Sequence, residues 1–139
     1  MKNPPKKCLA AGMKRTPQRL AVLAYLDGNT SHPSAEEVYR ALSKKNPTLS
    51  FATVYNTLNA LTKAGTVSEL TIDAERKRFD PNTVPHHHCI CTRCKKIIDI
   101  MKDITVDLPA DSAKGFSVAG SHVEFYGHCS RCANKRRPQ

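Results

Sequence analysis

The sequence is short, has no long apolar run and contains few acidic residues. Each of these features narrows the classes of protein to which it can belong. With 139 residues, the chain forms one ordinary domain or two small ones, and it is too short for a large enzyme with a deep cleft. No apolar run approaches a signal-peptide core or a membrane span. We therefore expect a cytoplasmic protein without a membrane partner.

Acidic residues are the scarcer charge. The 22 Lys and Arg outnumber the 12 Asp and Glu, which leaves a formal net charge of +10 at pH 7. Such an excess favours a polyanionic partner, of which nucleic acid is the commonest. Many basic proteins are merely soluble, so the charge alone does not decide between these interpretations.

The six cysteines point to metal binding, because disulfides are rare in a reducing compartment. Four of them form two C-x-x-C pairs, Cys91 with Cys94 and Cys129 with Cys132. Four thiolates in a tetrahedron make a closed structural zinc site, while an iron centre or redox dithiols are the alternatives. The surrounding segment has little core, so we expect zinc to stabilise it and zinc loss to unfold it.

Residues 16 to 65 predict three consecutive helices. Their expected starts are Thr16-Pro17, a capping box at Ser34–Glu37, and Ser50. Their expected ends are Gly28, the region of Asn46-Pro47, and Gly65. The third helix carries an apolar stripe that we expect to be buried, formed by Phe51, Val54, Leu58 and Leu61.

Opposite that stripe, the third helix presents small and amide side chains: Ala52, Thr53, Asn56, Asn59 and Lys63, flanked by Tyr55. Such side chains suit reading of the DNA major groove, although an ordinary amphipathic helix has a similar solvated face. The segments TVSELTI and RKRFD then predict a two-stranded hairpin, which completes a winged helix and favours the DNA-reading interpretation. Basic side chains that would contact phosphates are Lys14, Arg15, Arg19, Arg76, Lys77 and Arg78.

The stretch PNTVP, residues 81–85, carries two prolines and indicates a linker. We therefore expect an α+β protein with a winged-helix DNA-binding domain at residues 1–80 and a metal-binding domain at residues 86–139. Within the second domain, the sequence predicts strands at HHHCIC, KKIIDI and SHVEFYGHC, with a short helix between Asp103 and Lys114.

The histidines at the start of the second domain suggest another metal site. On a strand, His86 and His88 share one face, while His87, Cys89 and Cys91 share the other. The alternative is a polar loop that binds nickel adventitiously. Further ligands can be proposed from His32, Asp80 and Asp99, giving nitrogen and oxygen donors that suit Fe(II), Mn(II) or Zn(II). Spacing alone does not establish this set.

Seven motifs, in this order, resemble the ferric uptake regulator family of metal-dependent transcription factors: KRTPQR, HPSAEEVY, SFATVYNTLNAL, RFD, HHHCICTRC, IID and YGHCSRC. The resemblance covers about residues 12–132. It implies an N-terminal winged helix and a C-terminal α/β dimerisation domain, acting as a homodimer on a pseudo-palindromic operator in double-stranded DNA.

The same resemblance assigns roles to individual residues. It implies that Cys91, Cys94, Cys129 and Cys132 hold structural Zn(II), and that Tyr55 and Asn56 lie in the recognition helix. It also implies a regulatory Fe(II) or Mn(II) site formed by His32, Asp80, His86, His88 and Asp99.

Two aspartates in the regulatory set favour one branch of the family. Iron-uptake regulators typically carry glutamate at the positions of Asp80 and Asp99, whereas peroxide-sensing members carry aspartate, and zinc-sensing members usually have a cysteine ligand. The resemblance thus implies a peroxide-responsive repressor that is inactivated by oxidation of His32 or His86 rather than an enzyme. Departures are extra donors at His87 and Cys89, and Lys95 where the family often has Gly.

Three other functions are compatible with the sequence. The first is an iron-responsive repressor of iron-uptake genes without peroxide chemistry. The second is a thiol oxidoreductase that uses its C-x-x-C pairs, in which case the basic surface is incidental. The third is a zinc-stapled interaction module, which would show no salt-dependent DNA binding. Cys8 and Cys89 are further thiols with a reactivity that no motif specifies.

Overall fold

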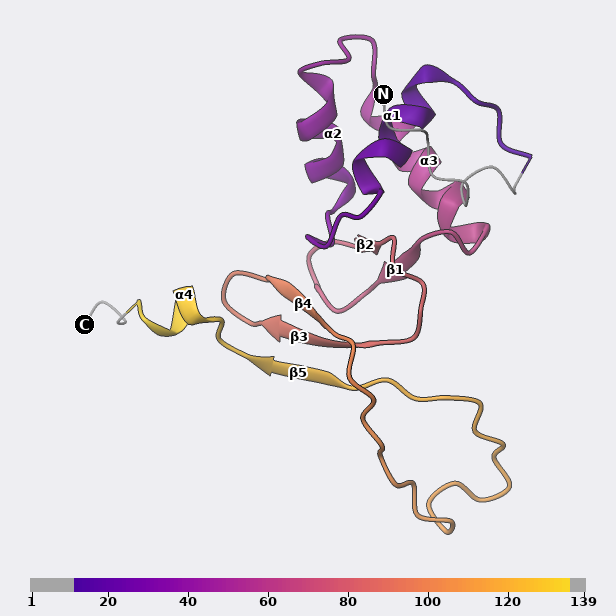
Figure 1. Ribbon diagram of the computed structural model, residues 1–139, viewed down its shortest axis with the longest axis vertical. Coiled ribbons are helices and arrows are strands. Elements are labelled where there is room, and N and C mark those ends of the chain that lie inside the picture. Colours follow the sequence, from indigo (N-terminus) through magenta and orange to yellow (C-terminus); the bar gives the residue numbers. More distant parts are fainter. Residues whose placement is uncertain (1–11, 136–139) are drawn as a thin grey trace. The chain divides into compact units, whose positions relative to one another are not determined.

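The computed structural model describes residues 12–135, and its chain is an α+β protein that divides into two compact units between Thr83 and Val84 (Figure 1). Each unit has its own elements. Cys8 lies outside the described residues. Among residues 12–135, no helix is long and apolar enough to cross a membrane.

Three helices form most of the first unit: α1 (Pro17–Leu26), α2 (Ala35–Ser43) and α3 (Phe51–Lys63). Each begins at a predicted cap, since the side chains of Thr16, Ser34 and Ser50 accept backbone N–H groups of the first turn. At Ser34 the capping box is complete, because the Glu37 carboxylate accepts the Ser34 N–H at 2.8 Å. The sequence therefore determines all three helix starts locally.

The helix ends differ in how well the sequence predicts them. Gly28 and Gly65 follow α1 and α3 with φ of 67° and 70°, the left-handed conformation that glycine adopts without steric cost. The second helix ends at Ser43, earlier than expected. There the Asn46 side-chain amide donates to the Leu42 carbonyl at 2.9 Å, which satisfies a terminal acceptor without a further helical turn.

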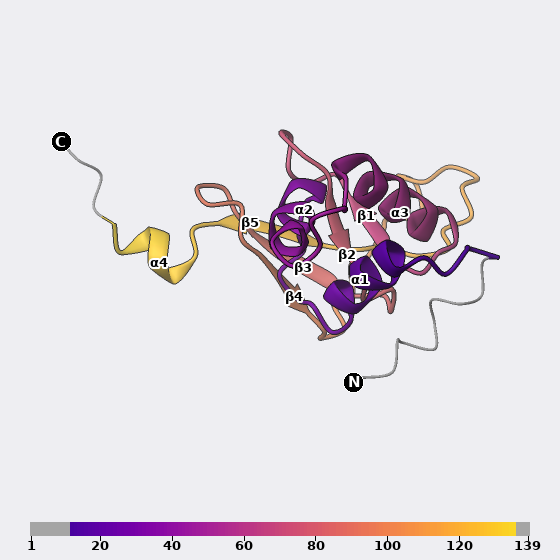
Figure 2. The ribbon, with the colours of Figure 1, turned by 90° about the horizontal axis from the view of Figure 1, so that it is seen from above.

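The helices of the first unit pack around one apolar core, and Figure 2 shows them grouped together. The core includes Val22, Leu26, Val38, Val54, Leu58, Leu61 and Phe79, all fully or almost fully buried. One expected core residue is wrong: Phe51 is 40% exposed. It lies in the first turn of α3 and packs edge-on against Tyr39, with ring centroids 5.9 Å apart. Thr57 is buried instead, and its hydroxyl donates to the Thr53 carbonyl.

An antiparallel hairpin follows α3, formed by β1 (Ser68–Leu70) and β2 (Arg78–Asp80). Phe79 anchors the hairpin in the helical core, and its backbone N–H donates to the Pro33 carbonyl at 2.9 Å. Three helices followed by this hairpin make the winged-helix arrangement. The hairpin also places the end of β2 beside the loop between α1 and α2.

The second unit is a three-stranded sheet with strand order β4-β3-β5. The central strand β3 (His87–Cys91) pairs antiparallel with β4 (Ile97–Ile100) and parallel with β5 (Glu124–Gly127). A short helix, α4 (Ser130–Ala133), follows β5. The side chains of β3 alternate between two faces of this sheet.

The segment between β4 and β5 contains neither helix nor strand, and Figure 1 shows it as a long loop. The helix expected between Asp103 and Lys114 is therefore wrong. Only turns form, at residues 110–115. Ile104, Thr105 and Val106 are β-branched and Pro109 interrupts the stretch, so the segment has weak helical propensity. Three of its apolar side chains, Val106, Leu108 and Phe116, are more than half exposed.

Candidate metal centres and nucleic-acid face

The four cysteines of the two C-x-x-C pairs lie together in the second unit. Cys91 ends β3, Cys94 follows in a turn, Cys129 caps α4 and Cys132 lies within α4. Their sulfur atoms all lie within 4.8 Å of one another, and the Cys94 and Cys129 sulfurs are 3.7 Å apart. A tetrahedral Zn(II) with Zn–S bonds of about 2.3 Å requires sulfurs about 3.8 Å apart. The cluster therefore fits a tetrahedrally bound metal.

Backbone hydrogen bonds shape the two turns that carry the sulfurs. In the first turn, the Lys95 N–H donates to the Cys91 carbonyl at 2.8 Å, which closes a tight loop with Lys95 at a φ of 62°. Cys132 N–H donates to the Cys129 carbonyl in the second. The two turns are joined by Arg93, which donates from Nη1 to the Cys132 carbonyl at 3.2 Å.

The thiols of this cluster have unequal acidities. Backbone N–H groups, first that of Cys94 and then that of Cys129, lower the pKa of Cys91 to about 5. Burial, followed by the neighbouring cysteine side chains, raises the pKa of Cys132 to about 12. Four adjacent thiolates are thus unfavourable without a cation, and a divalent soft metal supplies the compensating charge.

The expected regulatory ligands fall into two groups, one in each unit. In the first unit, His32 Nε2 lies 3.4 Å from an Asp80 oxygen, and both side chains are almost completely buried. His32 has φ of 51°, an uncommon conformation for a residue other than glycine. Its carbonyl accepts from Arg78 Nε at 2.5 Å. This contact holds the His32 loop against Arg78, the first residue of β2.

In the second unit, His86, His88 and Asp99 come together on one face of the sheet. The pairing of β3 with β4 places His88 opposite Asp99. One Asp99 oxygen lies 3.2 Å from His86 Nε2 and 3.5 Å from His88 Nε2, and the two imidazole rings are 4.6 Å apart. Both groups therefore supply imidazole nitrogens and carboxylate oxygens, the donors that suit Fe(II) and Mn(II).

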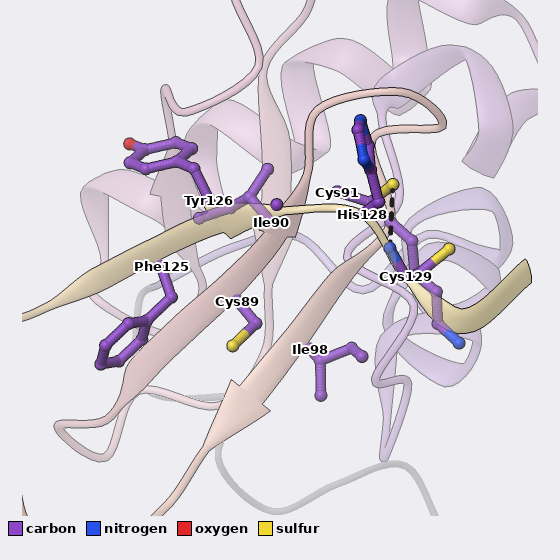
Figure 3. A pocket seen from close by; sticks show the side chains of 10 residues that line it. Cys89, Ile90, Cys91, Ile98, Phe125, Tyr126, His128 and Cys129 are labelled. Atoms are coloured by element: carbon purple, nitrogen blue, oxygen red, sulfur yellow. Dashed lines mark hydrogen bonds between the residues drawn. The ribbon is translucent and has the colours of Figure 1, made fainter. Parts of the chain in front are cut away.

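His87 and Cys89, the two other potential metal ligands near His86 and His88, do not face Asp99. His87 Nδ1 accepts the backbone N–H of Val123 at 2.9 Å, so this imidazole fastens β3 to the residue before β5. Cys89 lies opposite Ile98 and Phe125 in the strand pairing, on the face away from His88. Figure 3 shows it between these two side chains, at a cavity of about 290 Å³.

A row of polar side chains on β5 and just before it was not among the expected site residues. Glu124 accepts from Tyr126 through one carboxylate oxygen, and its other oxygen lies 3.0 Å from His122 Nε2. The Tyr126 hydrogen bond, followed by the contacts with His122, lowers the pKa of Glu124 despite partial burial. The alternate spacing of these residues in SHVEFYGHC was a signal that they would share one face.

Most of the expected DNA-facing residues are exposed on the first unit, whereas Arg19, Thr53 and Asn59 are half-buried. Ala52, Tyr55 and Asn56 are exposed on α3, while the Thr53 hydroxyl bonds to the Ser50 hydroxyl at 2.9 Å. Lys14 is exposed and its carbonyl accepts from Arg19 Nη1.

One expected phosphate contact is wrong. Arg78 is 7% exposed and donates to the carbonyls of Ser31 and His32 and to the Asp73 carboxylate. It is a buried structural residue because its side chain points into the hairpin base. Arg76 and Lys77 remain exposed, although Lys77 Nζ lies 3.1 Å from Glu69.

Known proteins resemble this chain over most of its length. The model of the ferric uptake regulator family matches residues 10–126. A peroxide-responsive repressor PerR from Staphylococcus epidermidis is 43% identical over 124 residues, covering 88% of this chain and 83% of that protein. The solved ferric uptake regulator from Francisella tularensis with iron has a TM-score of 0.71 at 26% identity, covering 88% of this chain and 96% of that one. The solved GAS PerR-Zn-Zn has a TM-score of 0.51 at 34% identity, covering 96% and 87%.

Proposed function

The chain belongs to the ferric uptake regulator family, and we propose that within this family it is a metal-dependent transcriptional repressor that senses peroxide. The observation that carries the proposal is the donor set. The side chains that match the family's regulatory site supply only imidazole nitrogens and aspartate oxygens, from His32, Asp80, His86, His88 and Asp99. The 43% identity to a PerR protein supports the same branch.

Structural zinc is the first part of the proposal. The four sulfurs of Cys91, Cys94, Cys129 and Cys132 have the separation that tetrahedral Zn(II) needs. No open coordination position remains in such a site, so its role is to stabilise the second unit. The solved GAS PerR-Zn-Zn supports zinc as the metal.

Regulatory Fe(II) or Mn(II) is the second part. We assign the His32 and Asp80 group and the His86, His88 and Asp99 group to a single ion, which ties the DNA-binding unit to the dimerisation unit. Metal is then an allosteric effector, and DNA and metal strengthen each other's binding reciprocally. In a homodimer, the ion sets the spacing of the two recognition helices, which must match about one DNA turn, roughly 34 Å.

Contact with operator DNA is the third part. The exposed Ala52, Tyr55 and Asn56 and the neighbouring Thr53 face the base edges from α3, and Lys14 and Arg19 contact phosphates. The excess of 22 Lys and Arg over 12 Asp and Glu supports a polyanionic partner.

Peroxide inactivates the repressor by oxidising a ligand. His32 and His86 would be ligands of a bound Fe(II), which would supply the redox chemistry that activates peroxide, while their imidazole rings are the groups that are oxidised. In the net reaction, one peroxide oxygen replaces a ring C–H with C–OH and the other leaves as water. An imidazole altered in this way is a poorer ligand, so metal and DNA are released. The reaction occurs once per site, and we therefore do not propose an enzyme.

Peptide mass spectrometry tests this function. Protein loaded with Fe(II) or Mn(II) receives a brief, near-stoichiometric peroxide pulse, and the peptides that hold His32 and His86 are examined for one added oxygen. We expect the addition in the iron sample alone. An unmodified iron sample whose metal-dependent DNA binding persists would instead indicate an iron-responsive repressor, an alternative that the likeness to the iron-bound Francisella tularensis regulator favours.

Substitution of one ligand tests the allosteric step. His32→Ala removes the imidazole from the first unit, and we expect operator affinity in excess Mn(II) to fall to that of the metal-free protein. Unchanged zinc content and circular dichroism establish that the variant folds. Operator affinity equal to that of the unsubstituted protein would contradict the assignment of His32.

A further inference from the structure

The imidazole of the central strand has a carboxylate neighbour on each side. His88 on β3 is paired with Asp99 on β4 and with Glu124 on β5. Partners across a sheet point to the same face, so the three side chains form one row. Asp99 is among the expected ligands, whereas Glu124 matches no ligand in the resemblance.

Glu124 is held firmly in its place. Tyr126 O–H donates to one of its oxygens, and His122 Nε2 lies 3.0 Å from the other. Its side chain is only 21% exposed, whereas that of His122 is 62% exposed. A carboxylate fixed in this way at a half-buried position keeps its charge near His88.

We propose that Glu124 is an affinity-determining residue for the regulatory metal, a positioning residue that acts on the ion through His88 and through its own negative charge. The groups that surround a metal-binding histidine tune its strength as a ligand, and Glu124 is the cross-strand partner of His88 on the same face. The added negative charge also offsets the charge of a divalent ion. This inference rests on the proposed function, because it requires the ion to bind at His86, His88 and Asp99.

The test is a titration of the zinc-loaded full-length protein with Mn(II), in which the electron paramagnetic resonance signal of free Mn(II) reports binding. Glu124→Gln keeps the shape of the side chain and removes its charge, and we expect Mn(II) affinity to fall roughly ten-fold or more. Glu124→Asp restores the charge and should recover much of the affinity. The matched control is Asp111→Asn, which removes one carboxylate from the exposed turn at residues 110–115.

The possible outcomes distinguish a failure of this inference from a failure of the proposed function on which it rests. Affinity of Glu124→Gln within two-fold of the unsubstituted protein, or an equal loss in Asp111→Asn, overturns the role of Glu124 and leaves the regulatory site intact. Absence of Mn(II) binding in the unsubstituted protein overturns both. If Glu124→Gln loses its zinc, Tyr126→Phe decides the matter: a several-fold weaker affinity supports the role, and an unchanged affinity contradicts it.

Discussion

Lys95 adopts a backbone conformation that suits glycine. Its φ is 62°, and its N–H closes the turn that carries Cys91 and Cys94. A side chain in this left-handed conformation costs on the order of 1 kcal/mol. We expect Lys95→Gly to raise the free energy of unfolding of the zinc-loaded protein by about that amount, as measured by urea denaturation. Lys96→Gly, at the next position of the same turn, should give no gain, and an equal gain there would contradict this explanation.

Asp73 and Arg78 form a buried ion pair at the base of the hairpin, with a separation of 3.4 Å. Burial pushes the pKa of Asp73 upward, but the Glu75 N–H and the Arg78 guanidinium outweigh it, so the pKa lies below its ordinary value of 3.8. The folded state therefore favours the ionised carboxyl. This stabilisation is present above the unfolded-state pKa and is lost as the pH falls through the lower folded-state pKa.

Asp73→Asn should lower the free energy of unfolding by about 2 kcal/mol at neutral pH, because Arg78 loses its charged partner. The difference in the free energy of unfolding between this variant and the unsubstituted protein should have its full size at about pH 5. It should shrink as acid protonates Asp73. Urea denaturation at several pH values measures it. Glu75→Gln, a charge removal on the exposed side of the same turn, is the control. A difference that persists in acid would exclude the ion pair as its source.

At the scale of elements, α3 depends on its first turn. Ser50 Oγ accepts the Thr53 N–H at 3.1 Å and bonds to the Thr53 hydroxyl. We expect Ser50→Ala to lower the free energy of unfolding by about 1 kcal/mol. Because α3 carries the proposed DNA-facing residues, operator affinity should fall as well. Ser112→Ala, in the exposed turn after β4, should change neither quantity. A Ser50→Ala variant with an unchanged free energy of unfolding would contradict the importance of this cap.

Local chemistry explains which elements the sequence predicts. Caps at Thr16, Ser34 and Ser50 and glycines at Gly28 and Gly65 act within one turn of the chain, so the three helices were predictable. So was the clustering of the two C-x-x-C pairs. Helical periodicity wrongly predicted that Phe51 is buried. A side chain in the first turn of a helix can lie beyond the edge of the core, even when it shares a face with the buried residues of later turns.

Features set by distant contacts could not be predicted in the same way. Arg78 lies in a run of basic residues that suggests a surface patch. Its side chain is buried because it donates to carbonyls of the His32 loop, which lies more than forty positions away in sequence. The grouping of His32 with Asp80 likewise depends on the pairing of that loop with β2. The resemblance to a family supplied these ligands, and spacing did not.

At the scale of the whole molecule, the apolar core is unequally divided. The main buried cluster runs from Val22 to Phe79 and lies within the first unit. Ile90 and Ile97 are the buried aliphatic side chains among the described residues of the second unit, together with Cys91 and Cys132. The cysteine cluster thus replaces a hydrophobic core there.

Removal of zinc should therefore unfold one unit and spare the other. After prolonged treatment with a strong chelator, we expect amide hydrogens of β3, β4 and β5 to lose protection from exchange, while α1, α2 and α3 keep theirs. Hydrogen exchange followed by mass spectrometry resolves the two sets. Simultaneous loss of protection in all elements would show that the units unfold together.

The central strand β3 contributes residues to both candidate metal centres. Cys91 at its end belongs to the cysteine cluster, while His88 three positions earlier faces the opposite side toward Asp99. A slip of one residue in the pairing would reverse every side chain of the strand. The zinc proposed at Cys91 would therefore fix which face receives the imidazoles, although it shares no ligand with them. Under the proposed function, a cell that runs short of zinc would lose its response to peroxide even while its iron supply remains sufficient.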